Sequence, residues 1–176
     1  VLADDSVDEA KRATAEQLGR ARHARFVAKV AAGTMQGGLD MTTSIQDIKQ
    51  VIEEMIPFDL FLGMKVEEAR PGYARIRLPY RPEFIGDPRR PALHGGIIST
   101  LIDTCGGTAV WASCEVQDRV ATIDLRVDYL RPVPPEDVIA EAEVKLLGNR
   151  VGNASVRIFS VGNPELTLAE GRGVYN

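Results

Sequence analysis

The feature that most constrains this chain is a two-residue hydrophobic repeat that dominates its C-terminal two thirds. Apolar and charged residues alternate in five segments, and this period predicts strands with one buried face. The segments are 72–79, 122–130, 137–146, 153–161 and 165–175. Gly/Asn turns at 147–152 and 161–166 predict hairpins between the last three segments. We therefore expect the last four strands to form an antiparallel meander.

One predicted helix, over residues 95–113, interrupts the strands and must cover their sheet. A wide apolar stripe runs along it at helical spacing. The stripe consists of Ile97, Ile98, Leu101, Ile102, Cys105 and Ala109. Asp103 falls instead on a narrow stripe of small and polar residues, together with Gly96 and Gly107. We expect the Asp103 carboxylate to point into a confined space, and the glycine pair at 106–107 to allow close packing against a neighbouring backbone.

The start of this helix and Asp103 both suit chemistry on a carbonyl group. The first N–H groups of a helix lack acceptors and lie at its positive end, where an oxygen gaining negative charge is stabilised. Gly95 and Asp103 are eight residues apart, which is roughly 12 Å along the axis. Two such helices, antiparallel across a two-fold axis, would bring one helix start to the other chain's Asp103. This spacing predicts an active site shared between subunits.

Composition narrows the classes of partner. The net charge of −4 and the pI of about 5.3 argue against a nucleic-acid-binding surface. No apolar run approaches the roughly 20 residues that span a bilayer, and the first residues are too acidic for a signal peptide. Cys105 and Cys114, placed within one predicted helix, fit free thiols in a reducing compartment. We expect a cytoplasmic protein without nucleic-acid or membrane partners.

The N-terminal third has a different character. Residues 6–32 lack proline and are rich in helix-forming residues. Glycines then break the pattern, and a second helix over 44–56 is predicted, with Thr43 or Ser44 as its cap. We expect a helical extension over 1–56 and a single α+β domain over 57–176.

The motif "LHGG", with an acid nine residues after the histidine, is followed by "TIDLRVDYLRP" and an "LG" hairpin. This set resembles the hotdog-fold acyl-CoA thioesterases of the phenylacetate-degradation type, within the 4-hydroxybenzoyl-CoA thioesterase-like superfamily, over about residues 58–175. The resemblance implies an antiparallel sheet wrapped around one central helix, in a homodimer or homotetramer. It also implies hydrolysis of acyl-CoA thioesters to the free acid and CoA. No metal and no cofactor are implied beyond the CoA of the substrate.

The resemblance assigns catalytic roles by position. Asp103 would be the nucleophile or the general base, and these two roles stay open. The Gly95 N–H would polarise the thioester carbonyl, His94 would hold this turn by hydrogen bonds, and Thr122 would place the attacking water. Many family members have an asparagine six residues before the histidine, where this chain has Pro88. We expect the adjacent Asp87 to substitute for it.

Further residues are expected to bind the substrate. Gly96 would lie beside the thioester carbonyl of the substrate at the helix start. Arginines recognise phosphates by charge and paired hydrogen bonds, so residues in the loop before the helix and in the 147–152 turn would contact CoA. These residues are Arg89, Arg90, Asn149 and Arg150. Phe58 and Phe61 would line the acyl pocket, because apolar walls sort acyl chains by shape.

Two other functions stay open. One is a different hotdog enzyme, a hydratase or dehydratase, which typically uses a catalytic histidine together with an acid. Besides His94 this chain has only His23, in the extension. The other is a non-catalytic acyl-CoA-binding protein. Release of free thiol from acyl-CoA separates the three functions, because only hydrolysis produces it.

Overall fold

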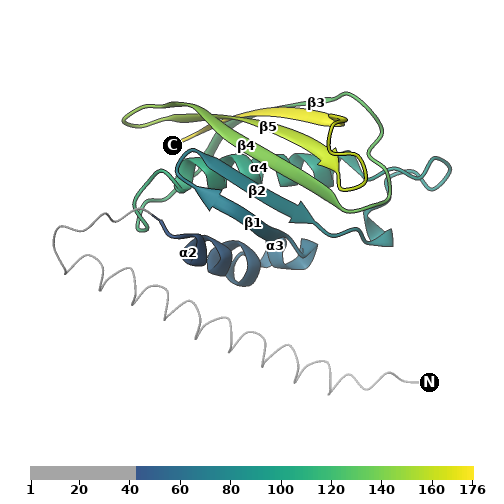
Figure 1. Ribbon diagram of the computed structural model, residues 1–176, viewed down its shortest axis with the longest axis horizontal. Coiled ribbons are helices and arrows are strands. Elements are labelled where there is room, and N and C mark those ends of the chain that lie inside the picture. Colours follow the sequence, from purple (N-terminus) through teal and green to yellow (C-terminus); the bar gives the residue numbers. More distant parts are fainter. Residues whose placement is uncertain (1–42) are drawn as a thin grey trace, which may run out of the picture. The chain divides into compact units, whose positions relative to one another are not determined.

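The computed structural model describes residues 43–176, so the helix predicted over 6–32 lies outside the described residues. Figure 1 shows a six-stranded antiparallel sheet with one long helix, α4 (Gly95–Trp111), against one of its faces. This is the expected α+β hotdog architecture, and the helix at its centre carries Asp103. Within the described range, no helix has the length and apolar character needed to cross a membrane.

The strands are β1 (Lys65–Arg70), β2 (Tyr73–Leu78), β3 (Thr122–Tyr129), β4 (Val138–Leu147), β5 (Gly152–Ser160) and β6 (Ala169–Tyr175), in the spatial order β1-β2-β4-β5-β6-β3. The two predicted hairpins join β4 to β5 and β5 to β6. The predicted four-strand meander is wrong for its first member, because β3 pairs with β6 and not with β4. The connection from β3 to β4 contains Pro132, Pro134 and Pro135, which do not suit a tight hairpin.

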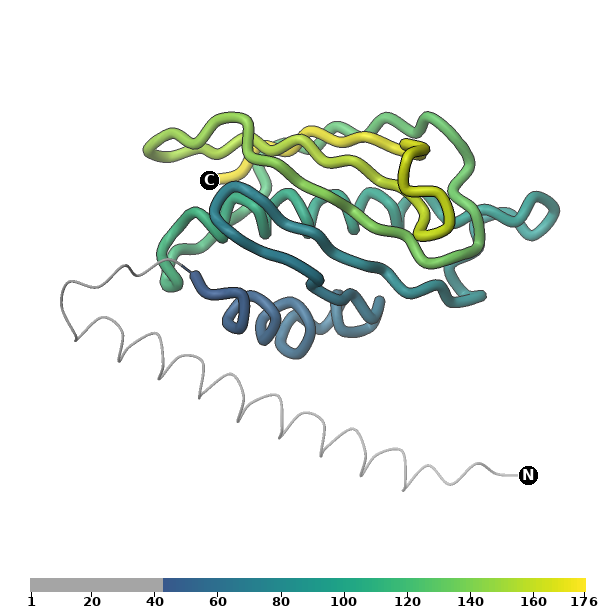
Figure 2. Tube along the Cα trace, in the orientation of Figure 1, coloured from purple at the N-terminus to yellow at the C-terminus, as the bar shows by residue number. Residues whose placement is uncertain are grey.

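Strand β1 was not predicted from the sequence. Its burial does not alternate, since Val66 is its only fully buried residue, and the register with β2 shifts between Val66 and Glu68. A strand interrupted by such a bulge loses the two-residue repeat on which the prediction relied. Strand β1 forms one edge of the sheet and β3 forms the other, as Figure 2 also shows.

The short helices before the sheet are α2 (Ile45–Gln50), the π-helical segment η1 (Val51–Met55) and α3 (Pro57–Leu62); a 3-10 turn, η2 (Pro82–Phe84), follows β2. Ser44 caps α2 as predicted, since its Oγ accepts the Asp47 N–H at 3.2 Å. Ile48 and Ile52 are buried in the hydrophobic core, so α2 and η1 contribute to it. The division between residues 1–56 and 57–176 stays a prediction.

The predicted apolar stripe of α4 faces the sheet. Ile98, Leu101, Ile102 and Cys105 are completely buried there, and burial raises the pKa of the Cys105 thiol. A side chain at Gly106 would overlap the Tyr175 hydroxyl. The close approach predicted for the glycine pair is therefore to a tyrosine side chain and not to backbone.

The helix ends at Trp111, which leaves Cys114 beyond it, and both cysteines are free.

The edge strand β3 departs most from its predicted burial. Its alternation predicts a buried apolar face, yet Ile123 is 57% and Tyr129 is 54% exposed, while Leu125 and Val127 are half-buried. Because β6 pairs with only one side of β3, the other side presents unpaired backbone groups next to apolar side chains. Such an edge is suited to pairing with another strand.

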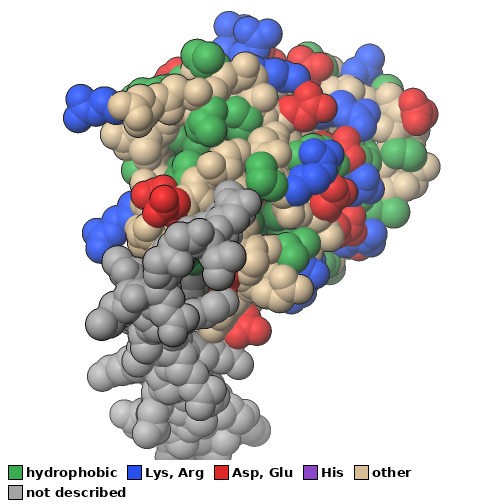
Figure 3. Space-filling model, turned by 60° about the vertical axis from the view of Figure 1, so that its left-hand side comes forward, with side chains coloured by type: hydrophobic (Ala, Val, Ile, Leu, Met, Phe, Trp, Pro, Cys, Tyr) green, Lys and Arg blue, Asp and Glu red, His purple; other side chains and the backbone are tan. Residues whose placement is uncertain are grey.

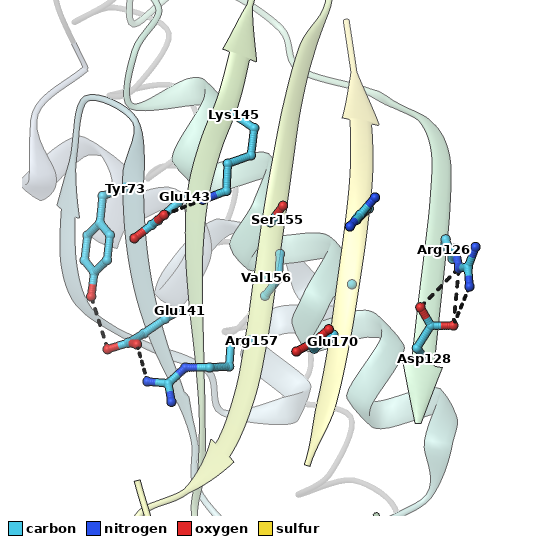
Figure 4. Close-up of a pocket in the computed structure, with 12 residues that line it drawn as sticks. Tyr73, Arg126, Asp128, Glu141, Glu143, Lys145, Ser155, Val156, Arg157 and Glu170 are labelled. Carbon is cyan, nitrogen blue, oxygen red and sulfur yellow. Dashed lines mark hydrogen bonds and ion pairs between the residues drawn. The ribbon is translucent and has the colours of Figure 1, made fainter. Parts of the chain in front are cut away.

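The outer face of the sheet is covered by paired charges. A hollow of about 440 Å³ extends across the sheet from β2 to β3. Figure 4 shows its lining, where Arg157 pairs with Glu141 at 2.9 Å and Arg126 pairs with Asp128 at 3.1 Å. The space-filling view of Figure 3 likewise shows positive and negative side chains interspersed on the molecular surface. Exposed pairs of this kind keep a surface solvated and contribute little to stability.

Candidate active site

A pocket of about 530 Å³ surrounds the Asp103 side chain. Asp103 lies in the middle of α4 and is half-buried. Thr100 and Gly107, from the same narrow stripe of the helix, line the pocket with it. The remaining walls come from η1, α3, the segment before β3 and the end of β6. Thr100, Asp103 and Gly107 of the small polar stripe therefore share one pocket, whereas Gly96 lines another.

Thr122 holds the Asp103 carboxylate. The Thr122 Oγ1 donates a hydrogen bond of 2.8 Å to Asp103 Oδ1. Hydrogen bonds to a carboxylate are stronger than those between neutral groups, so this contact fixes the side chain in the pocket. The hydroxyl of Tyr175 also donates to the Asp103 main-chain carbonyl at 3.2 Å, which ties the helix to β6. Because a hydroxyl that donates one bond still has acceptor lone pairs, Thr122 is also able to bind a water beside Asp103.

The start of α4 forms the second part of the candidate site. His94 is the N-cap, and its Nδ1 accepts the Gly96 N–H at 2.9 Å. His94 therefore holds the turn as expected, and the Gly96 N–H is already used within the chain. The Gly95 N–H has no acceptor among residues 43–176. Gly95 is therefore the free donor at the positive end of the helix.

Tyr129 packs on Gly95, a contact that the sequence did not indicate. Its hydroxyl donates to the Gly95 carbonyl at 2.9 Å. A Cβ at Gly95 would lie 3.3 Å from the tyrosine ring, which is tighter than an ordinary contact. The glycine therefore allows the end of β3 to approach the helix start, and the tyrosine supports the backbone that presents the free N–H.

The two parts do not meet within one chain. Gly95, Gly96 and Tyr129 line a pocket of about 460 Å³ that has no lining residue in common with the Asp103 pocket. The eight residues between Gly95 and Asp103 lie on one continuous helix, so the donor and the carboxylate are roughly 12 Å apart along its axis. One subunit thus contains a base or nucleophile in one pocket and an oxyanion donor in another.

Asp59 is a further carboxylate in the Asp103 pocket, which Asp118 also lines, and Asp59 was not predicted from the sequence. It lies on α3 and is only 4% exposed. Burial raises its pKa to about 6, a hydrogen bond from Thr104 acts in the opposite direction, and the charge of Asp103 raises it further. An acid inside the apolar segment "PFDLFL" is the same signal that singled out Asp103, so the sequence did contain the information needed to find it.

The two phenylalanines expected in the acyl pocket are stacked on each other, with ring centroids 6.3 Å apart. Phe58 lines the Asp103 pocket, whereas Phe61 lies outside its lining. The Arg81 guanidinium sits over the Phe61 ring at 5.0 Å. Phe61 therefore contacts Phe58 but is itself 63% exposed, so its place in the acyl pocket stays a prediction.

The residues expected to bind CoA are exposed and do not belong to the lining of either pocket. In the loop between η2 and α4, Arg89 pairs with Asp87 at 3.1 Å, and this arginine lowers the pKa of the Asp87 carboxyl. Arg90 lies beside them. Asn149 and Arg150 occupy the β4–β5 turn. The structure brings none of these residues to Asp103 within one chain, so their contact with CoA stays a prediction.

Comparison with known proteins agrees with this fold. A model of the thioesterase superfamily matches residues 91–167. A candidate esterase of Halobacterium salinarum is 43% identical over 122 residues, which are 65% of this chain and 80% of that protein. The medium/long-chain acyl-CoA thioesterase YigI of Escherichia coli is 30% identical over 149 residues, 76% of this chain and 95% of that protein. A solved Shewanella oneidensis structure, related to the thioesterase superfamily, is 26% identical with a TM-score of 0.66, covering 74% of this chain and 93% of that one.

Proposed function

This chain belongs to the thioesterase superfamily, and on that premise we propose that it hydrolyses acyl-CoA thioesters to the free acid and CoA at a site shared between two subunits. The observation that carries the proposal is the separation of Asp103 from the Gly95 N–H into two pockets on one helix. Each pocket holds half of what acyl transfer requires. A second copy of the chain supplies the missing half.

The exposed edge of β3 supports this assembly. Antiparallel pairing of two β3 edges across a two-fold axis would cover Ile123 and Tyr129 and would continue the sheet from one subunit into the next. Helix α4 contacts β3, so the two α4 helices would then lie antiparallel to each other. That arrangement brings Gly95 toward the partner subunit's Asp103. This pair of subunits would be the whole protein in a homodimer, or one half of it in a homotetramer.

The chemistry follows from the groups present. A thioester carbonyl is electrophilic and needs no metal or redox cofactor. The Gly95 N–H stabilises the negative charge that develops on the carbonyl oxygen. Asp103 either attacks the carbonyl carbon itself or takes a proton from a water that attacks it. If water attacks, a C–O bond forms, the C–S bond breaks, and the proton taken by Asp103 passes to the CoA sulfur. If Asp103 attacks, the CoA thiolate leaves and an anhydride between the acyl group and Asp103 remains. A water then hydrolyses this anhydride to the free acid, restores the Asp103 carboxylate and supplies the proton of the thiol.

The walls of the Asp103 pocket favour an acyl chain. Ile52, Ile56 and Phe58 give this pocket an apolar lining beside the carboxylate. The name of the Escherichia coli relative makes medium and long acyl chains the first candidates for this protein too. The "LHGG" motif and the following strand support the phenylacetate-degradation type, for which an aryl group would occupy the same pocket.

The test is thiol release from octanoyl-, palmitoyl- and phenylacetyl-CoA by the wild type, Asp103→Asn and Asp118→Asn. Asp118 is a matched control, because it also lines the pocket but its carboxylate accepts a hydrogen bond from the Glu115 N–H. We expect turnover by the wild type and the control, and a loss of about 100-fold or more in Asp103→Asn. Binding of acyl-CoA without thiol release would contradict the proposal and support a binding protein, and hydration of an enoyl-CoA without thiol release would support a hydratase.

A further inference from the structure

Asp59 is a buried carboxylate that the proposed reaction leaves without a role. It is the third residue of α3, follows Pro57 and Phe58, and lies in the pocket that holds Asp103. Burying a carboxylate is costly unless hydrogen bonds or an opposite charge compensate. A structural carboxylate would therefore be expected to have strong partners.

The compensation found at Asp59 is weak. Its Oδ1 accepts one side-chain hydrogen bond, from Thr104 Oγ1, at the long distance of 3.4 Å. Thr104 follows Asp103 directly on α4, so this contact places Asp59 against the turn of helix that carries Asp103. By contrast, the Asp103 carboxylate has a short hydrogen bond from Thr122. Three carboxylates line the pocket: Asp103 and Asp118 each accept a short hydrogen bond, whereas Asp59 accepts only a long one.

The charge that acts on Asp59 is a like charge and does not neutralise it. Helix α4 contributes Asp103, a like charge that raises the pKa of Asp59. The segment before β3 contributes Asp118 and Arg119, and β6 contributes Tyr175, whose pKa burial raises. The η1 residues that line the pocket, Val51 and Ile52, are uncharged. Burial, with Asp103, brings the pKa of Asp59 to about 6, so its charge changes within the pH range in which enzymes commonly work.

We propose that Asp59 is a positioning residue of this site, whose negative charge beside Asp103 promotes the transfer of charge from Asp103 to the thioester. The role rests on the proposed function. In either route Asp103 gives up its negative charge, to a bond with the carbonyl carbon or to a proton taken from water. The charge moves to the carbonyl oxygen at the partner subunit's helix start, farther from Asp59. Repulsion between Asp59 and Asp103 in a pocket of low polarity is therefore relieved as the reaction proceeds.

The pH dependence of kcat/KM tests this role, because a merely structural carboxylate would not produce it. We expect wild-type kcat/KM to rise about threefold to tenfold as Asp59 ionises around pH 6. Asp59→Asn, which mimics the neutral acid, should match the wild type near pH 5 and lack the rise. Glu143→Gln, which neutralises an exposed carboxylate on the outer face of the sheet, should keep it. An Asp59→Asn enzyme that keeps the rise, or that loses activity equally at every pH, would overturn the proposal.

Thr104→Val gives a second test that leaves the carboxyl in place. Removing the Thr104 hydroxyl removes the hydrogen bond that lowers the pKa of Asp59, so the midpoint of the rise should move to higher pH. A midpoint that stays in place would overturn the proposal even if Asp59→Asn does not fold.

A readout without turnover separates this inference from the proposed function. In carbon-13 carboxyl titrations, the Asp59 midpoint should fall when Asp103 is replaced by asparagine, because a like charge has been removed. If the wild type is active but the Asp59 midpoint does not change, the charges of Asp59 and Asp103 do not interact and the proposal is overturned. If the wild type hydrolyses no thioester, the proposed function fails and the role of Asp59 in it fails too, whatever the titration shows.

Discussion

The Thr122 hydroxyl donates a 2.8 Å hydrogen bond to Asp103 Oδ1 and so joins the first residue of β3 to the middle of α4. Replacing Thr122 by valine keeps the shape of the side chain and removes this bond. We expect kcat to fall about tenfold in Thr122→Val, whereas Thr122→Ser, which keeps the hydroxyl, should stay within about threefold of the wild type. Equal losses in both variants would contradict a role for the hydroxyl.

Substitution of Gly95 by proline removes its free N–H with little other change to the helix start. Proline is well tolerated at the first position of a helix, and the extended backbone of His94 (ψ 132°) is compatible with a following proline. We expect Gly95→Pro to lower kcat by about 100-fold or more, the loss typical of one oxyanion donor. Gly95→Ala is the control, since its Cβ also crowds Tyr129 but its N–H remains. The ratio of the two kcat values measures the contribution of the N–H, and a ratio near one would exclude it.

The shared site predicts complementation between two inactive proteins. A mixed dimer of Asp103→Asn and Gly95→Pro subunits has one site with both groups intact and one with neither. After unfolding and refolding as an equal mixture, about a quarter of the wild-type activity should return, since half of the dimers are mixed and each has one working site. Activity that stays at the level of the separate variants would show that each subunit works alone.

The edge of β3 provides a second test of the assembly. Ile123→Lys places a charge in the proposed interface and should shift the protein toward monomers in analytical ultracentrifugation, with thiol release falling in parallel. Leu166→Lys is the matched control, because this leucine is also exposed but lies on the β5–β6 connection. Monomers of Ile123→Lys with full activity would contradict the shared site.

Asp59 should make the folded protein less stable at alkaline pH. A carboxyl whose pKa is raised from its ordinary 3.8 to about 6 by folding contributes stability below pH 4 that is lost as the pH rises through 6. We therefore expect Asp59→Asn to raise the free energy of unfolding by about 2 kcal/mol at pH 8 and by little at pH 4. Urea denaturation at the two pH values gives the difference. An equal effect at both would show that the charge of Asp59 is not responsible.

The loop arginines should recognise the nucleotide end of CoA and not the thioester. Replacing Arg89 and Arg90 together by glutamine removes two charges that could meet phosphates. We expect KM for an acyl-CoA to rise about tenfold, while KM for the same acyl group on a short pantetheine thiol, which lacks the nucleotide, stays unchanged. Equal changes for both substrates would assign the arginines to the stability of the loop.

Several parts of the fold could be predicted because the signal lies along the chain itself. The period of two gave the positions of β2 to β6 to within a few residues, and the apolar stripe of α4 predicted which residues contact the sheet. The bulge hid β1, and the partner of β3 depends on a contact with β6 across the sheet that no local pattern encodes. The exposed face of β3 shows the same limit, since alternation reports that a face is apolar and not what covers it.

For the candidate site, the sequence by itself determined which groups are suited to the chemistry: a carboxylate in an apolar helix, and a histidine and two glycines at the start of that helix. Residue type, helical spacing and the unpaired N–H groups of a helix start are local properties, so no three-dimensional information was needed. The tertiary structure alone decided which groups are neighbours. It joined Thr122 to Asp103, placed Tyr129 on Gly95, buried Asp59 beside Asp103, and separated the two halves of the site into different pockets. These relations depend on how β3, α3 and α4 pack, because burial and distance between segments far apart in the chain are set only when the whole core is formed.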